Sequence, residues 1–201
     1  MSATIPFVAF AVFAVANWVA VGRGDKPMEY LTKPAALVAL IVYAATGEQP
    51  SVWLIAALAL SLLGDVYLML PTDVFTAGLG AFLLAHVSYV IDFDVSLTRR
   101  FVCCALALAA MSPFAVRIIR AVTNGTLRIA VVCYMAVIGL MVGSARASGS
   151  LAAQLGALLF MASDTLLGWN RFVGPISWAR PAIMVTYHLG QLGLVYAVRG
   201  S

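Results

Sequence analysis

The sequence predicts an all-α membrane protein, a polytopic transmembrane bundle of about eight helices. Of its 201 residues, 63% are hydrophobic and only 10% are charged, and the mean hydropathy is +1.01. A soluble domain averages roughly 45–50% apolar and about 25% charged residues, so a water-soluble fold of this length would lack the polar surface to cover its core. The apolar residues form continuous segments, not the alternating pattern of a β-barrel. Helices satisfy the requirement that backbone groups in lipid be paired internally.

Eight apolar segments follow one another along the chain. Most approach the roughly 20 residues that cross a bilayer as a helix, and the second segment is the shortest. The polar breaks between them are too short to separate domains, so we expect one integral membrane domain over residues 1–201. The expected helices lie near residues 3–22, 31–46, 51–70, 75–93, 101–119, 127–144, 150–169 and 180–198.

Residues that favour turns separate these segments. Glycine, proline and asparagine interrupt helices or begin turns, and they recur where the apolar runs stop. The acidic residues near the segment ends, Glu29 among them, are expected to be solvated. The clearest breaks are Gly22–Pro27, Gly47–Pro50, Pro71–Asp73 and Asn124-Gly125.

The basic excess, 12 Lys and Arg against 8 Asp and Glu, is scattered between the segments. Nucleic-acid binding needs a basic patch with residues that read bases, and no such run is present in the sequence, so we expect no nucleic-acid partner. Basic residues instead favour the cytoplasmic ends of spans, which predicts that both termini face away from the cytoplasm. The side after odd-numbered segments holds Arg23, Lys26, Lys33, Arg117, Arg120, Arg128, Arg171 and Arg180, against Arg99, Arg100, Arg146 and Arg199 on the other.

Two aspartates inside apolar segments are the strongest chemical signal. Asp65 lies in the third segment and Asp164 in the seventh. A charged side chain at mid-membrane costs at least about 2.5–3.5 kcal/mol on insertion scales, so each requires a reason. If the two segments meet, burial and like charge favour one neutral acid beside one ionised carboxylate, an acid/base pair. The structural alternative is that each Asp is a hydrogen-bonding group or pairs with Lys33.

Other polar residues of the segments share helix faces with one another. His86 and Tyr89 are three residues apart in the fourth segment, and Tyr187 and Gln191 are four apart in the eighth, which places each pair on one face. His188 lies beside Tyr187. Tyrosines at such positions also form aromatic belts at membrane interfaces, and a single buried histidine is often only a packed core residue.

Five fragments in this order resemble the YhhN, or lysoplasmalogenase, family of eight-helix membrane proteins. They cover about residues 28–195, and no single fragment is specific. His188 departs from the family pattern, which leaves a metal site open. The fragments are Thr32-Lys33-Pro34, Leu63-Gly64-Asp65, Gly80 with His86-Val87-Ser88-Tyr89, Gly156 with Phe160 and Ser163-Asp164, and Tyr187 with Gln191.

The resemblance implies hydrolysis of the vinyl ether bond of a lysophospholipid of the lysoplasmalogen type, with no cofactor. Asp65 and Asp164 match the catalytic pair expected of the family. The resemblance also implies an integral multi-pass protein, of the cell membrane or the inner membrane if the host is bacterial. We expect substrate to be bound by His86, Tyr89, Ser163, Tyr187 and Gln191, with Lys33 meeting the phosphate near the membrane surface.

The residues suit this chemistry. A vinyl ether is cleaved by protonating its β-carbon, which gives an oxocarbenium ion that water captures. A positioned neutral carboxyl group supplies the proton and an ionised carboxylate stabilises the cation. Two alternatives stay open: a metal-dependent lipid amidase or esterase that uses His86, His188, Asp65 and Asp164, and a proton-coupled transporter that uses the two aspartates. The sequence leaves the oligomeric state undetermined.

Overall fold

The computed structural model describes residues 3–199 and confirms the all-α fold. Eight helices are long and apolar enough to cross a membrane, and a single π-helical turn, Trp169–Val173, extends the seventh. Within residues 3–199 there is no strand. The helices are α1 (Thr4–Arg23), α2 (Lys26–Ala45), α3 (Val52–Met69), α4 (Phe75–Asp92), α5 (Leu97–Ala121), α6 (Gly125–Ala147), α7 (Leu151–Gly168) and α8 (Ala179–Arg199).

Helix α2 begins earlier than the hydropathy pattern predicts, at Lys26 instead of near residue 31. The Asp25 carboxylate accepts a hydrogen bond from the Met28 backbone N–H at 3.2 Å, and Pro27 suits the first turn because it has no N–H to satisfy. The extra turn carries Glu29 into the protein. The expectation that Glu29 is solvated is therefore wrong, since only 8% of this residue is exposed.

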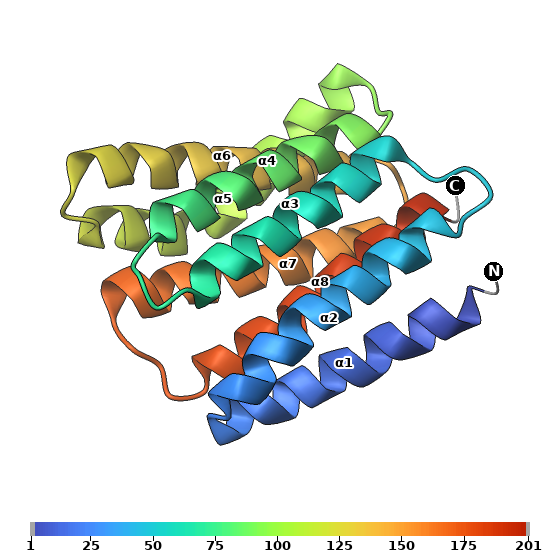
Figure 1. Cartoon of the computed structure of the whole chain (residues 1–201). Coiled ribbons are helices and arrows are strands. Elements are labelled where there is room, and N and C mark those ends of the chain that lie inside the picture. The colour runs from blue at the N-terminus through green and yellow to red at the C-terminus, as the bar shows by residue number, and fades with distance from the viewer. Residues whose placement is uncertain (1–2, 200–201) are drawn as a thin grey trace.

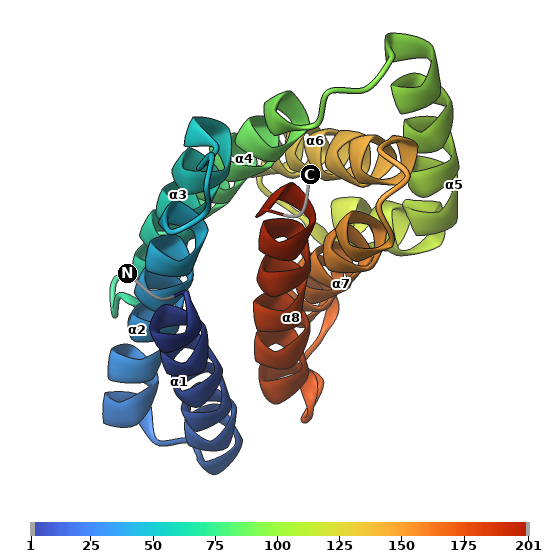
Figure 2. The same ribbon diagram turned by 90° about the vertical axis from the view of Figure 1, so that its right-hand side faces the viewer.

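Consecutive helices pack as antiparallel hairpins: α1 with α2, α3 with α4, α5 with α6 and α7 with α8. Contacts of α2 with α3, of α4 with α6, of α6 with α7 and of α1 with α8 join these hairpins into one bundle. Figure 1 and Figure 2 show the arrangement of the eight helices from two sides. Helices α3 and α7 are not among the closely packed pairs of residues 3–199. The two aspartates therefore lie on helices that do not pack closely against each other.

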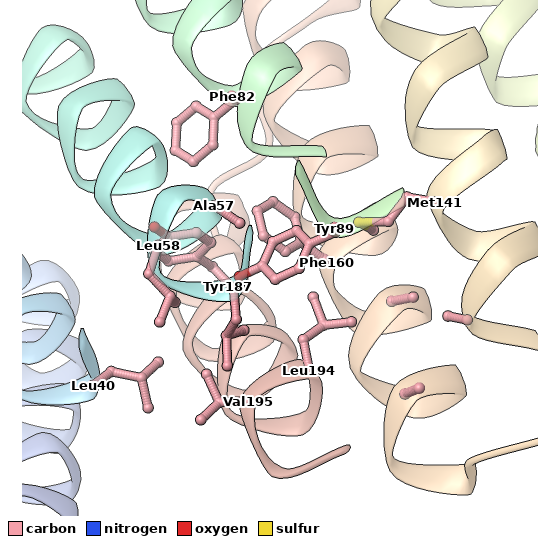
Figure 3. Packing of buried hydrophobic residues seen from close by; sticks show 14 of the residues in the cluster. Leu40, Ala57, Leu58, Phe82, Tyr89, Met141, Phe160, Tyr187, Leu194 and Val195 are labelled. Carbon is pink, nitrogen blue, oxygen red and sulfur yellow. The ribbon is translucent and has the colours of Figure 1, made fainter. Parts of the chain in front are cut away.

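The bundle is apolar inside and outside, as expected of a protein in lipid. Its core contains Leu40, Leu58, Phe82, Phe160 and Leu194 (Figure 3). Large apolar side chains also point outward, and a soluble protein rarely exposes so many. They include Ile5, Val52, Leu97, Ile129, Leu151 and Tyr196, all more than 60% exposed. The chain is a multi-pass membrane protein.

Three glycines hold α7 and α8 in backbone contact, which fixes the positions of their polar side chains. A Cβ atom on Gly156 would lie 2.7 Å from the Leu194 backbone nitrogen, and one on Gly190 would lie 2.9 Å from the Phe160 nitrogen. A Cβ atom on Gly193 would lie equally close to the Gly156 Cα. Small residues permit such approach in membranes, where no hydrophobic force drives helices together.

Gly156→Ala is expected to destabilise the protein by roughly 1–3 kcal/mol, the usual cost of overpacking, because the clash is with backbone that cannot rotate away. Gly80→Ala is the matched control, since a Cβ there would meet nothing within 4 Å and alanine favours a helix. Thermal unfolding in detergent would measure both. Equal midpoints for the two variants would contradict the close packing of α7 on α8.

Candidate active site

A cavity of about 180 Å³ enters the bundle between the ends of α2, α3, α7 and α8. Both predicted catalytic aspartates lie on its wall. Its outer part carries exposed charged side chains and its inner part carries buried ones, so it runs from the surface into the membrane region. The lining residues are Val21, Lys26, Glu29, Lys33, Asp65, Leu68, Met69, Phe82, Ser163, Asp164, Leu167, Arg180, Ile183, Met184 and Tyr187.

Asp65 accepts hydrogen bonds from donors on two other helices. The Lys33 ammonium donates to Oδ1 at 2.8 Å, and the Tyr187 hydroxyl donates to Oδ2 at 2.8 Å. The side chains of Lys33 and Asp65 are 7% and 2% exposed, so each charge has the other as its compensation. This geometry agrees with the structural alternative, in which one of the aspartates pairs with Lys33.

Asp164 has different neighbours. The Tyr134 hydroxyl from α6 donates to Oδ2 at 2.5 Å, and the Nε2 atom of His86 from α4 lies 3.4 Å from the same oxygen. No Lys or Arg pairs with this carboxyl group among residues 3–199. The second aspartate therefore has no cationic partner of the kind that Lys33 provides for the first.

The hydrogen bond made by His86 indicates which of its ring nitrogens carries a proton. Its Nδ1 lies 2.6 Å from the carbonyl oxygen of Phe82. A carbonyl only accepts hydrogen bonds, so Nδ1 carries a proton. In a neutral ring Nε2 is then an acceptor, and it would face a second acceptor, the Asp164 carboxylate, in a buried site. A proton on either group would turn this opposition into an attraction, and His86 Nε2 makes no hydrogen bond within the part of the chain that the structure describes.

Three aromatic rings pack together at the inner part of this cavity, and two of them, Phe82 and Tyr187, line it with both aspartates. The rings of Phe82, Phe160 and Tyr187 meet edge to face with centroids 5.4–6.2 Å apart (Figure 3). His86 packs on Phe160 with centroids 4.7 Å apart. The packed rings restrict the positions of the Tyr187 hydroxyl and the His86 ring, which lie beside Asp65 and Asp164 respectively.

A second cavity, of about 40 Å³, adjoins the first. The first is called the polar cavity below, because charged side chains line it, and the second is called the apolar cavity. Asp164 and Phe82 line both cavities, together with Leu68 and Leu167. Asp164 therefore lies where a polar cavity meets an apolar one. The remaining residues of the apolar cavity are Phe75, Leu79, Ile118, Val131, Tyr134, Met135, Gly168 and Phe172.

The predicted substrate-binding residues fall into two groups. Lys33, Ser163 and Tyr187 line the polar cavity, although the Ser163 hydroxyl also donates to the Ile183 carbonyl at 3.1 Å. His86, Tyr89 and Gln191 are fully buried behind the wall, where the Tyr89 hydroxyl donates to Gln191 Oε1. Substrate binding by these six residues remains a prediction.

The environment of Lys33 differs from the expected one. Its ammonium lies beside Asp65 in the interior instead of near the membrane surface. The charges at the outer end of the cavity belong to Lys26, Glu29 and Arg180.

Sequence reasoning missed Tyr134, which bonds to Asp164. Its signal was a phenol in the middle of an otherwise apolar segment. A buried hydroxyl needs a hydrogen-bond partner, so a tyrosine at that depth predicts a polar group on a neighbouring helix.

His188 forms its hydrogen bond with a residue of α1 and not with either aspartate. Its Nδ1 accepts a hydrogen bond from Trp18 Nε1 at 3.0 Å. Residues 3–199 contain no group of three or more His, Cys, Asp or Glu side chains that could hold a metal ion. The proposed four-residue metal set is therefore not brought together.

The chain is similar to a set of curated membrane enzymes. The lysoplasmalogenase TMEM86B of Sus scrofa is 30% identical over 174 residues, covering 85% of this chain and 75% of the relative. TMEM86B of Mus musculus is 28% identical over 195 residues, covering 94% and 83%. A lysoplasmalogenase of Mycobacterium tuberculosis is 31% identical over 153 residues, covering 67% and 59%. No solved structure matches. The sequence profile of the YhhN family matches residues 28–198, and the chain belongs to this family.

Proposed function

We propose that this protein hydrolyses the vinyl ether bond of lysoplasmalogen-type lysophospholipids, with Asp164 as the proton donor and Asp65 as the ionised carboxylate. The products are a fatty aldehyde and a glycerophospho-alcohol such as glycerophosphoethanolamine. The enzyme class is a hydrolase acting on ether bonds, since the matched relatives are lysoplasmalogenases.

The position of Asp164 between the two cavities carries the proposal. In a lysoplasmalogen the vinyl ether is the bond that joins the polar glycerophosphate part to the hydrocarbon chain. A substrate with its polar part in the first cavity and the start of its chain in the second places that bond beside Asp164. The rest of the chain continues into the bilayer.

The first step is protonation of carbon. Asp164 gives its proton to the alkene carbon farther from the ether oxygen, which forms a C–H bond and leaves an oxocarbenium ion. The new carboxylate keeps the hydrogen bond from Tyr134, and such bonds are stronger to a charged acceptor. Positioned general acids contribute typically about 10²–10⁴-fold to rate.

The second step adds water. The Asp65 carboxylate, fixed by Lys33 and Tyr187, stabilises the cation and orients the water, as the second carboxylate does in glycosidases. The water oxygen bonds to the cationic carbon, and its proton returns to the Asp164–His86 pair. The hemiacetal then breaks its bond to the glycerol oxygen, which takes the hydroxyl proton, and aldehyde and alcohol leave.

The first experiment is turnover of a 1-alkenyl lysophosphoethanolamine by the purified protein in D₂O. We expect a fatty aldehyde that carries one deuterium at carbon 2, because that carbon receives the proton from the exchangeable acid. The 1-alkyl and 1-acyl analogues are control substrates and should stay intact.

Two results would contradict the proposal. Release of fatty acid from the 1-acyl analogue would indicate an esterase. Folded protein that forms no aldehyde would point to the transporter alternative, which uptake into proteoliposomes would then test.

The basic residues predict which side the substrate enters from. The cavity carries Lys26 and Arg180, from the segment ends that hold eight of the twelve Lys and Arg residues. From the positive-inside tendency we expect the mouth of the cavity to lie at the cytoplasmic face.

A further inference from the structure

We propose that Lys26, Glu29 and Arg180 form a subsite for a phosphoethanolamine head group. The cations bind the phosphate and Glu29 binds the primary ammonium. This inference rests on the proposed function because it names the head-group class of the same substrate. None of the five fragments that carry the family resemblance includes these three residues. They are here called the head-group cluster.

The head-group cluster lies at the outer end of the polar cavity. The side chains of Lys26 and Arg180 are 51% and 44% exposed, whereas those of Lys33 and Asp65, deeper in the same cavity, are 7% and 2% exposed. Exposure therefore falls along the cavity from the cluster to the carboxylates. A lysophospholipid has the same order, with its charged head group at the water and its ether bond inside.

The spacing along α2 suits the length of the substrate. Glu29 and Lys33 are four residues apart, so they share one face of the helix and are separated by about 6 Å along its axis. In a lysophospholipid, the glycerol backbone separates the phosphate from the ether oxygen. A phosphate at the cluster then places the ether oxygen near the depth of Lys33 and Asp65.

The cluster has donors available for a phosphate. Lys26 Nζ donates to Glu29 Oε2 at 3.0 Å, and Arg180 Nη2 donates to the same oxygen at 2.7 Å. An ammonium has three N–H groups and a guanidinium has five, so both cations retain donors beyond these bonds. Two cations and one carboxylate carry a net charge of +1, which complements a phosphodiester. The cluster also sits at the N-termini of α2 and α8, where helix dipoles favour anions.

Glu29 allows the cluster to distinguish one head group from another. Both cations bond to Oε2, and within residues 3–199 no hydrogen bond to Oε1 is formed. Oε1 can accept an N–H from a primary ammonium. The quaternary ammonium of choline has no N–H to donate, so it would gain only the electrostatic part of this interaction. The geometry therefore favours ethanolamine over choline, and both over a bare phosphate monoester.

Binding of uncleavable 1-alkyl lysolipids tests this subsite without turnover. The probes carry phosphoethanolamine, phosphocholine, phosphate or no head group, and dissociation constants are measured for the protein in detergent. Arg180→Gln is expected to weaken binding of the three phosphate-bearing probes about 10-fold or more, with no change for the 1-alkylglycerol. Glu29→Gln is expected to remove the preference for phosphoethanolamine over the phosphate monoester.

Arg171→Gln is the matched control for Arg180→Gln. Its side chain is equally exposed at 44%, it pairs with one carboxylate, that of Asp73 at 2.5 Å, and it lies outside the cavity lining. If both Arg variants lost the same affinity for the phosphate-bearing probes, the effect would come from surface charge in general. That result would overturn the subsite. Equal weakening of all four probes by Glu29→Gln, the 1-alkylglycerol included, would also overturn it.

The outcomes separate this inference from the proposed function. Wild-type protein that forms no aldehyde contradicts vinyl ether hydrolysis and leaves the binding comparison valid. Aldehyde formation with equal affinity for all head groups contradicts the subsite alone. Arg180→Lys keeps the charge and is expected to retain most of the phosphate affinity, which confirms that the loss in Arg180→Gln comes from the missing cation.

Discussion

Replacing Asp164 with Asn is expected to lower kcat for the 1-alkenyl lysolipid by about 10²–10⁴-fold, the usual contribution of a positioned general acid. The amide keeps the size of the side chain but has no proton to give to carbon. The hydroxyl of Tyr134 and the ring of His86 stay in place around it. Because the change removes a step and not a binding contact, KM should change much less than kcat.

Asp92→Asn is the control for this substitution. Asp92 is also a helix carboxylate that accepts a hydrogen bond from a hydroxyl, that of Ser51, but it lies at the end of α4 and outside the polar cavity. Its variant should keep wild-type turnover. A kcat for Asp164→Asn within about 3-fold of wild type would rule out Asp164 as the acid, since that is far below the expected 10²-fold.

His86→Gln is expected to give a smaller loss in kcat than Asp164→Asn. The histidine does not line the polar cavity, so we expect it to act through its position beside Asp164 and not through contact with the substrate. A positioning role of this kind predicts an altered pH dependence of kcat. An unchanged pH profile with a lowered unfolding midpoint would instead show a purely structural role.

The second large effect concerns the Lys33–Asp65 pair. Lys33→Met is expected to destabilise the protein by roughly 3–5 kcal/mol, because it leaves the Asp65 carboxylate buried without its cation. The double variant Lys33→Met with Asp65→Leu should recover much of this stability, since no buried charge remains. Both variants should lose activity, because neither keeps an ionised carboxylate fixed beside the substrate.

Lys26→Met is the control for Lys33→Met on the same helix. Lys26 pairs with Glu29 but is half-exposed, and exposed ion pairs contribute only about 0–1 kcal/mol. Unfolding in detergent would compare the four proteins. A double variant as unstable as Lys33→Met alone would mean that the lost stability came from packing and not from the uncompensated charge.

The two aspartates could be found from the sequence because carboxylates inside apolar segments are costly and stand out. Which of them is the acid could not be found. Asp65 and Asp164 occupy equivalent places in their segments, and their difference is the cation beside one and the histidine beside the other. Those neighbours come from α2 and α4, which no local pattern connects to α3 and α7.

The head-group cluster shows the same limit. Glu29 was expected in water because the hydropathy pattern begins the second helix near residue 31. The cap at Asp25 adds a turn, and that turn brings Glu29 to Arg180, which is 151 residues away in the sequence. Helix ends depend on a few capping bonds, whereas the existence of a span depends on many apolar residues, so spans are predicted better than their ends.

The amino-acid sequence was enough to predict the all-α membrane fold, the eight spans, the family and the two candidate carboxylates. The family follows from five short fragments in order. The rest follows from the summed cost of placing residues in lipid, which depends on residue type along the chain. Only the tertiary structure shows that Lys33 pairs with Asp65 and that Tyr134 and His86 lie beside Asp164. It also shows that His188 accepts a hydrogen bond from Trp18. Those pairings depend on which helix faces meet, and contacts between distant segments set the charge on each group.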